Sequence, residues 1–438
     1  MITRTAPPVS NRLPAPDMAL AERMFDELLA RTGDGPGVTR EAFGRGEQIA
    51  HDMLAREARL LGLEVTVDAG GNMLVTLPGR APDGKRVLMG SHLDSVPVGG
   101  NFDGAAGVLA GLAVLSGWCK AGLRPRRDVS VIAIRAEESN WFPWSYVGSK
   151  SALGLLPAEA LEVKRSDTGR SLRDHMADLG LDPAQVAVGV PQLRPETLAA
   201  YVELHIEQGP VLIGADVPVS LVTGIRGSFR YREMKVIGEY AHSGAVPMAW
   251  RHDAVVAASE LVVFLQQEWE RMEAEGHDMT ATVGILTTDP AQHAFSKIAG
   301  EVSMSIDIRS HDKATLDEMR RRLHLALDRI AAARGVRFET GPLTTSAAAL
   351  MDGHLLKVFG DAMAEQRLPH HAMASGAGHD AAVFAGAGVP SLMLFVRNQN
   401  GSHNPDEAME MADFDKSVQL LGAGVWALAE ECDSGEKP

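Results

Sequence analysis

Cysteine is nearly absent from this sequence, because only Cys119 and Cys432 occur among 438 residues. Two cysteines with no local metal-binding or redox spacing exclude a disulfide framework and fit a reducing compartment. The N-terminal stretch, Met1–Pro16, lacks the apolar core of a secretory signal. We therefore expect no signal peptide and a cytoplasmic location.

Long apolar runs and excess positive charge are also missing. No window approaches the roughly 18 uninterrupted apolar residues that a membrane-spanning helix needs, so we expect no membrane segment. The net charge is -15 and no cluster of lysine and arginine stands out, which argues against a nucleic-acid partner. Hydrophobic residues make up 45% and charged residues 23%, an ordinary globular balance. The length favours two domains.

Four apolar stretches predict buried strands of a mostly parallel sheet in an α/β domain. A histidine or an acidic residue follows each of them within a few positions. In open α/β sheets the ligand crevice lies beyond the carboxyl ends of the strands, so we expect these polar side chains to meet there. The four stretches are Arg86–Met89, Val129–Arg135, Tyr201–Leu204 and Pro390–Val396.

A different pattern occupies residues 224–343, which we interpret as an inserted α+β domain. Its expected order is β-α-β-β-α-β, the ferredoxin-like arrangement. The catalytic domain would then consist of residues 1–223 and 344–438. The expected elements are Arg226–Ile237, His252–Glu273, Thr280–Thr287, Gly300–Ile308, Lys313–Arg334 and Val336–Thr340. Near the N-terminus we expect a helix that is capped by Thr39 and ends near Leu61.

The first candidate site follows the strand at Arg86–Met89. His92 and Asp94 are two residues apart, so in an extended chain both side chains point to one side. This spacing lets the carboxylate accept the second ring N–H of a metal-bound imidazole. Asp103, at the mouth of the next expected helix, could reach the same metal. Taken alone, this motif is equally well explained as a capped turn.

The other candidates gain weight from their positions after strands. Glu137 and Glu138 directly follow an apolar strand, and in an extended chain one could bind a metal while the other acts as general base. His205 and His403 follow two further strands, although each could be an ordinary core or turn histidine. The expected ligands of two divalent ions are His92, Asp103, Glu138, His205 and His403, with Asp103 as the bridge. Zinc fits these ligands, and manganese, cobalt or nickel would fit as well.

The motifs together resemble the dinuclear-metal amidohydrolases of the aminoacylase and carboxypeptidase clan, and most closely the hydantoinase/carbamoylase branch. This branch contains N-carbamoyl-L-amino-acid amidohydrolases, β-ureidopropionase, and allantoate and ureidoglycolate amidohydrolases. The resemblance runs from Gly37-Val-Thr-Arg40 to the C-terminal helix. Its motifs are Gly-Ser-His92-Leu-Asp94-Ser, Gly-Gly-Asn-Phe-Asp103-Gly, Glu137-Glu138, His205-Ile-Glu-Gln208-Gly-Pro210, His242-Ser-Gly, Asp307-Ile-Arg309, Ser375-Gly-Ala-Gly-His379-Asp380 and Ser402-His403-Asn-Pro405.

The resemblance implies a role for each matching residue. It makes Glu137 the general base, and Asp94 the residue that orients the ligand His92. It makes the inserted domain a lid and homodimerisation domain, whose His242 stabilises the tetrahedral oxyanion in a neighbouring active site. It makes Arg309 the group that binds the substrate carboxylate, a task that suits a guanidinium fork. It also implies substrate contacts for Gln208 and for the backbone of Gly376 and Ala377. Ser296, and His379 in a glycine-rich loop before an expected helix, are further candidate substrate contacts.

Three segments depart from the family pattern. Trp141, Trp144 and Tyr146 follow the acidic pair where better-known carbamoylases carry glycine, serine and arginine, which predicts a bulkier or flatter substrate. Ser296 stands where family members often carry asparagine. The segment after His242 lacks the usual threonines.

We therefore expect a two-domain metalloenzyme that hydrolyses a linear amide or ureido C–N bond in a small carboxylate-bearing substrate. An N-carbamoyl-amino acid or related ureido acid is the first choice. An N-acyl-amino-acid amidase or dipeptidase-like exopeptidase is the alternative among enzymes. A catalytically silent metal-binding pseudo-enzyme is the alternative outside them.

Overall fold

The computed structural model describes residues 13–81 and 84–432. The expectation about a signal peptide falls largely on residues 1–12, outside the described part. The chain forms two compact units. The second contains Gly224–Leu350 and Ala374–Gly378, and the first contains the other described residues. Residues 344–350 and 374–378, which we expected in the catalytic domain, therefore pack with the second unit. No described helix is both long enough and apolar enough to cross a membrane.

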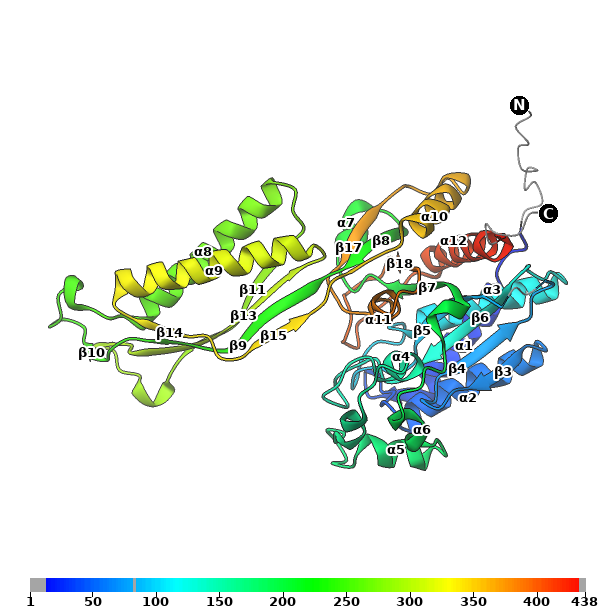
Figure 1. The fold of residues 1–438 in the computed structure, drawn as a ribbon, viewed down its shortest axis with the longest axis horizontal. Coiled ribbons are helices and arrows are strands. Elements are labelled where there is room, and N and C mark those ends of the chain that lie inside the picture. Colours follow the sequence, from blue (N-terminus) through cyan, green and yellow to red (C-terminus); the bar gives the residue numbers. More distant parts are fainter. Residues whose placement is uncertain (1–12, 82–83, 433–438) are drawn as a thin grey trace. The chain divides into compact units, whose positions relative to one another are not determined.

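A mixed sheet has the order β16-β8-β18-β7-β5-β6-β4-β3, with β17 paired to β8 (Figure 1). Most of its strands belong to the first unit, whereas β16 and part of β17 belong to the second. The central strands β18, β7, β5 and β6 run parallel to one another, whereas β18 with β8, β6 with β4 and β4 with β3 pair antiparallel. The strands are β3 (Glu64–Val67), β4 (Met73–Leu77), β5 (Arg86–His92), β6 (Asp128–Ile134), β7 (Leu198–Ile206), β8 (Val219–Ile225), β16 (Ala349–Leu350), β17 (Ala372–Ser375) and β18 (Ser391–Val396).

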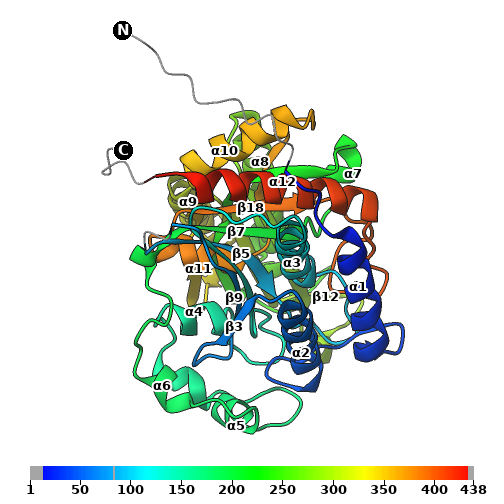
Figure 2. The same ribbon diagram turned by 90° about the vertical axis from the view of Figure 1, so that its right-hand side faces the viewer.

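Helices cover both sides of the parallel strands. Figures 1 and 2 show α12 on one side of β7 and β18 and α11 on the other. Helix α3 is buried along nearly its whole length, as its run of small apolar residues predicts. The helices are α1 (Met18–Thr32), α2 (Arg45–Leu60), α3 (Ala105–Lys120), α4 (Val147–Ala152), α5 (Leu172–Asp178), α6 (Pro183–Ala187), α7 (Val211–Ala215), α10 (Gly353–Glu365), α11 (Asp380–Gly386) and α12 (Met411–Glu430).

The predicted cap of the second helix is wrong. Helix α2 begins at Arg45, with Gly44 at the N-cap. Thr39 lies in the preceding segment, where its hydroxyl donates to Asp34 and accepts the backbone N–H of Val98. These tertiary partners hold Thr39 in the loop and delay the helix by about one and a half turns.

The second unit has the expected β-α-β-β-α-β order. Its antiparallel sheet is ordered β11-β13-β9-β14, and β15 also pairs with β9. Helices α8 and α9 contribute to one buried apolar core with the inward side chains of this sheet. The elements are β9 (Gly227–Ile237), β10 (Ala241–His242), α8 (Ala254–Ala274), β11 (Thr280–Thr288), β12 (Lys297–Ile298), β13 (Glu301–Ser310), α9 (Lys313–Arg334), β14 (Arg337–Glu339) and β15 (Leu343–Ser346).

Candidate metal centre

The four parallel strands of the first unit deliver the predicted ligands to one place. β5 ends at His92 and β7 carries His205 one residue before its end. Glu138 follows β6, and His403 lies in the loop after β18. Because the carboxyl ends of parallel strands meet at one edge of the sheet, residues far apart in the chain become neighbours.

Asp103 joins these side chains into two groups. Its Oδ1 lies 3.1 Å from Nε2 of His205 and 3.6 Å from Nε2 of His92. Its Oδ2 lies 3.3 Å from Nε2 of His403, which in turn lies 3.0 Å from Oε1 of Glu138. Each group places its potential ligand atoms within 4.8 Å of one another, and Asp103 belongs to both.

The hydrogen bonds of the His92 and His205 rings leave their Nε2 atoms suited to bind a cation. Nδ1 of His205 lies 2.9 Å from the carbonyl oxygen of Ile206, and Nδ1 of His92 lies 3.3 Å from Oδ1 of Asp94. A neutral imidazole that donates a hydrogen bond through its Nδ1–H has an available lone pair on Nε2. The two Nε2 atoms then face each other at 3.5 Å, beside a buried Oδ1 of Asp103 that has no hydrogen-bond partner. Lone pairs and a carboxylate oxygen that converge in a buried place suit a divalent metal ion.

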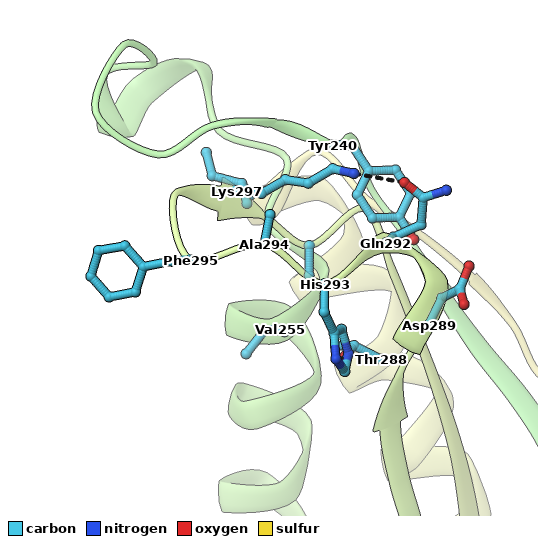
Figure 3. A pocket seen from close by; sticks show the side chains of 11 residues that line it. Tyr240, Val255, Thr288, Asp289, Gln292, His293, Ala294, Phe295 and Lys297 are labelled. Carbon is cyan, nitrogen blue, oxygen red and sulfur yellow. Dashed lines mark hydrogen bonds between the residues drawn. The ribbon is translucent and has the colours of Figure 1, made fainter.

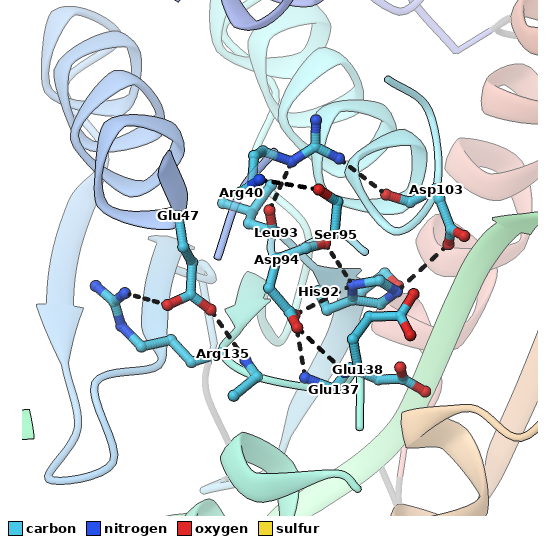
Figure 4. A network of polar contacts seen from close by, with 12 residues as sticks. Arg40, Glu47, His92, Leu93, Asp94, Ser95, Asp103, Arg135, Glu137 and Glu138 are labelled. Carbon is cyan, nitrogen blue, oxygen red and sulfur yellow. Dashed lines mark hydrogen bonds and ion pairs between the residues drawn. The ribbon is translucent and has the colours of Figure 1, made fainter. Parts of the chain in front are cut away.

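Asp94 connects the first ligand to the acidic pair, as Figure 4 shows. Besides its contact with His92, its Oδ1 accepts the backbone N–H of Glu137 at 3.0 Å, and its Oδ2 accepts that of Glu138 at 3.1 Å. Asp94 is fully buried. One carboxylate therefore fixes both the ring and the acidic turn.

Glu137 is buried next to the ligand group. Burial raises its pKa well above the ordinary value, and the charges of Glu138 and Asp380 add to this, although His92 opposes it. A raised pKa favours proton transfer near neutral pH, which a general base requires. A bound cation would lower this pKa again.

Three buried charged residues that the sequence did not single out support the same loops. Arg40 donates to the carbonyl oxygens of Leu93 at 2.8 Å and Asp103 at 3.3 Å (Figure 4). Oε1 of Glu407 accepts the backbone N–H of Asp103 at 3.2 Å. Glu47 accepts the N–H of Ala136, a non-glycine residue held at a φ of 50° just before the acidic pair. The motif Gly37-Val-Thr-Arg40 was the one signal that could have revealed Arg40.

Gly104 lets the loop of Asp103 approach the candidate ligand His92. Its φ is 66°, and a Cβ atom there would lie 2.4 Å from Cε1 of His92. Any side chain at this position would displace the imidazole, so the glycine is required by both conformation and space.

Gln208 and Ser402 both donate to Oδ2 of Asp103. The amide nitrogen of Gln208 donates to Oδ2 of Asp103 at 3.0 Å and to the hydroxyl of Ser402 at 2.9 Å. The backbone of Gln208 has a φ of 63°, and its N–H donates to the buried side chain of Asn398. The predicted substrate contact is thus placed beside the shared carboxylate.

Two of the residues singled out in the sequence are buried. Trp141 lies in a core cluster with Phe142, and its indole N–H donates to the carbonyl oxygen of Ser95. His379 is 2% exposed and its ring packs 4.6 Å from that of His205. His379 thus packs against a candidate metal ligand, and its contact with substrate stays a prediction.

The remaining predicted residues lie in the second unit. His242, in β10, is exposed and pairs in register with Lys297 of β12, next to Ser296. Nδ1 of His242 accepts the N–H groups of Gly244 and Ala245, both at 3.1 Å. The carbonyl oxygen of Gly376 accepts from Arg309 at 2.7 Å, and Ala377 exchanges hydrogen bonds with the hydroxyl of Ser375.

A hollow of about 510 Å³ lies beside Ser296 in this second unit. Figure 3 shows Lys297 over the ring of Tyr240, with its amino group 2.6 Å from the amide oxygen of Gln292. The lining contains no cluster of acidic groups like that around Asp103, so we assign it no metal.

Residues 88–426 match the model of peptidase family M20/M25/M40. The chain belongs to this family. It is 36% identical over 420 residues to an N-carbamoyl-L-amino acid amidohydrolase of Geobacillus stearothermophilus, covering 94% of this chain and 100% of the relative. It is 31% identical over 410 residues to an allantoate amidohydrolase of Bacillus subtilis, covering 92% and 96%.

Solved structures of the M20 family agree with these sequence relationships. A hydantoinase/carbamoylase family amidase from Burkholderia multivorans aligns with a TM-score of 0.85 at 30% identity, covering 95% of this chain and 99% of that one. The predicted family, the α/β fold and the assignment as an amidohydrolase are confirmed. The roles of single residues remain predictions.

Proposed function

We propose that the chain is a dinuclear metal-dependent amidohydrolase that cleaves the ureido C–N bond of an N-carbamoyl-amino acid or related ureido acid. The observation that carries the proposal is the position of Asp103 between two ligand groups, with one carboxylate oxygen toward each. A bridging carboxylate suits two divalent ions about 3.5–4 Å apart. Zinc suits this mixture of imidazole and carboxylate ligands, and manganese, cobalt or nickel are the alternatives.

The chain's own residues divide the chemistry among them. His92, Asp103 and His205 would hold one ion, and Asp103, Glu138 and His403 the other. The bound ions would supply a Lewis acid and lower the pKa of a water molecule. Glu137 would take the proton of that water on its carboxylate and pass it to the leaving nitrogen. Attack at the ureido carbon releases the amine and a carbamate, which decomposes to CO2 and ammonia.

The second unit would contribute the groups that bind substrate. Arg309 is proposed to bind the substrate carboxylate, and His242 to stabilise the oxyanion. Gln208, which already lies beside Asp103, and Ser296, Gly376 and Ala377 are proposed as further contacts. These roles rest on the match of this chain to family motifs.

We further propose a homodimer formed through the second unit. Several large apolar side chains of this unit are exposed, and two of them lie on β11, which is an edge strand of its sheet. An exposed apolar edge strand is a common pairing surface. The residues are Met248, Trp250, Val263, Ile285, Leu286 and Phe295. A cytoplasmic location remains our proposal, supported by two free cysteines.

A substrate panel tests the proposed function. The metal-loaded protein is given N-carbamoyl amino acids, allantoate and ureidoglycolate with ammonia as readout, and N-acetyl amino acids and dipeptides with free amine as readout. We expect ammonia from at least one ureido acid. Amine release from the acyl substrates alone would instead identify an acylase or peptidase. Bound metal without turnover of any substrate would favour a pseudo-enzyme.

A further inference from the structure

Arg309, the proposed carboxylate anchor, is already engaged by an acidic neighbour. Its Nη2 lies 2.8 Å from Oδ2 of Asp307, and its Nε donates to the same carboxylate. Its Nη1 donates to the carbonyl oxygen of Gly376 at 2.7 Å. A guanidinium has five N–H groups, so two remain, one on each terminal nitrogen. Arg309 thus keeps donors for a substrate, but Asp307 alone would cancel its charge.

Arg230 restores that charge from the neighbouring strand. Asp307 of β13 is directly opposite Arg230 of β9, and Nε of Arg230 lies 3.1 Å from Oδ2 of Asp307. Arg309 is two residues beyond Asp307 on the same strand, so both side chains lie on one face of the sheet. Asp307 is therefore shared by two arginines, and the three groups carry one net positive charge.

Among the described residues, the neighbouring pair of Arg226 and Asp278 does not remove this excess. Arg226 also lies near Gly376, but its guanidinium is paired with Asp278 through Nε at 2.9 Å. His311 contacts the same Asp278, with Nδ1 at 2.8 Å from Oδ2. Arg226 and Asp278 therefore cancel each other, and the uncompensated charge belongs to the cluster of Arg230, Asp307 and Arg309.

We propose that Arg230 is a positioning residue that determines the preference for carboxylate-bearing substrates. It acts by neutralising Asp307, so that Arg309 keeps a full charge for the substrate. This inference rests on the proposed function, because it needs Arg309 as the anchor. It assigns the selectivity for an anionic substrate to a charge balance of three residues.

The exposed fraction of these three side chains determines how strongly the loss of one charge should change the KM. The side chains of Arg230, Asp307 and Arg309 are 26%, 27% and 35% exposed. Solvent and salt therefore screen their charges in part, and loss of one charge should change the KM by roughly 3- to 10-fold rather than by orders of magnitude. Higher ionic strength should reduce the difference between wild type and variant.

The experiment compares an N-carbamoyl amino acid with its carboxamide, which keeps the ureido group and lacks the negative charge. Arg230→Gln should raise the KM for the acid about 3- to 10-fold, with little change in kcat and none in the KM for the amide. Arg230→Lys should restore most of the lost preference because it keeps the charge. Arg232→Gln, which removes one exposed charge from the same strand, should leave the preference unchanged.

The double variant separates charge from structure. In Arg230→Gln/Asp307→Asn the net charge of the cluster is again positive, so the preference for the acid should return. A double variant that is worse than Arg230→Gln alone would overturn the inference and leave Arg230 a structural role. If Arg230→Gln does not fold, Asp307→Asn alone still decides the question. Asp307→Asn should strengthen or preserve the preference for the acid. A loss of that preference in this variant overturns the inference.

The wild-type measurement separates this inference from the proposed function. Wild-type protein that processes acid and amide equally well would overturn the carboxylate anchor and this inference together. A wild-type preference for the acid that persists unchanged in Arg230→Gln would overturn only the inference.

Discussion

Oδ1 of Asp94 lies 3.0 Å from the backbone nitrogen of Glu137, which makes this buried carboxylate the direct support of the candidate general base. The same oxygen lies 3.3 Å from Nδ1 of His92. A change at Asp94 should therefore disturb a metal ligand and the base at once, although Asp94 would touch neither metal nor substrate.

Asp94→Asn should weaken metal binding by about 10- to 100-fold, the usual cost of losing a partner of a ligating histidine. An asparagine also presents an amide N–H group to the backbone N–H of either Glu137 or Glu138, so kcat should fall even at saturating metal. Competition with a chelator measures the affinity. Asp68→Asn, which alters a half-buried, hydrogen-bonded carboxylate of the same unit, serves as the control. Equal loss in both variants would contradict a specific role for Asp94.

Glu137→Gln and Glu138→Gln should separate base from ligand. Glu137→Gln should keep both metal ions and lower kcat by about 10²- to 10⁴-fold, because the amide cannot take a proton. Glu138→Gln should lose metal content instead. Metal analysis of the purified variants, together with ammonia release, checks both. An unchanged kcat in Glu137→Gln would remove this residue as the base.

Metal affinity should rise with pH. In the metal-free protein, hydrogen bonds to Asp103 and Glu138 raise the pKa of His403 to about 10. The charged ring thus stabilises the metal-free fold fully below about 6.5, its ordinary pKa, and this contribution is lost as the pH rises through about 10. A metal ion must displace that proton, so affinity should increase up to about tenfold per pH unit for each proton released. Calorimetric titrations in buffers of different ionisation enthalpy measure this release, and an affinity independent of pH would contradict it.

Arg40→Lys should destabilise the first unit. Lysine keeps the charge but cannot reach the carbonyl oxygens of both Leu93 and Asp103, which would leave a buried acceptor without a partner. The free energy of unfolding of the metal-free protein should fall by about 2–4 kcal/mol, measured by urea denaturation. Arg23→Lys, at an exposed arginine with a bond to Ala19, should change it by less than about 0.5 kcal/mol. Similar effects at both positions would show that the buried network is dispensable.

Mixed dimers test whether His242 acts across the proposed interface. Glu137→Gln and His242→Ala homodimers should each be nearly inactive. After subunit exchange, half of the dimers are mixed and each contains one complete site, so activity should recover to roughly a quarter of wild type. A mixture of Glu137→Gln with Glu138→Gln should show no recovery, because both changes lie in the same unit. Absence of recovery in the first mixture would argue against catalysis between subunits.

The sequence was sufficient to predict the strands and their polar ends where an apolar stretch is followed by a residue type that binds metal. Apolar stretches followed by His92, Glu138, His205 and His403 predicted parallel strands with polar side chains at their carboxyl ends. Two of these strands proved longer than expected, because pairing with neighbours extends a strand beyond its apolar residues. β5 includes His92, and β7 includes His205. The local pattern failed at Thr39, whose hydroxyl accepts the backbone N–H of Val98, 59 residues further along the chain.

By itself, the sequence determined the ligand types, the order of the elements and the family motifs, because these depend on residues close together in the chain. Only the tertiary structure decided which oxygen of Asp103 faces which histidine, that Arg40 and Glu407 hold the backbone of its loop, and that Arg230 shares Asp307 with Arg309. Glu407 is 304 residues from Asp103, and Arg230 reaches Asp307 only through the register of two strands. Such contacts depend on how whole elements pack, and a single sequence carries no local signal for that.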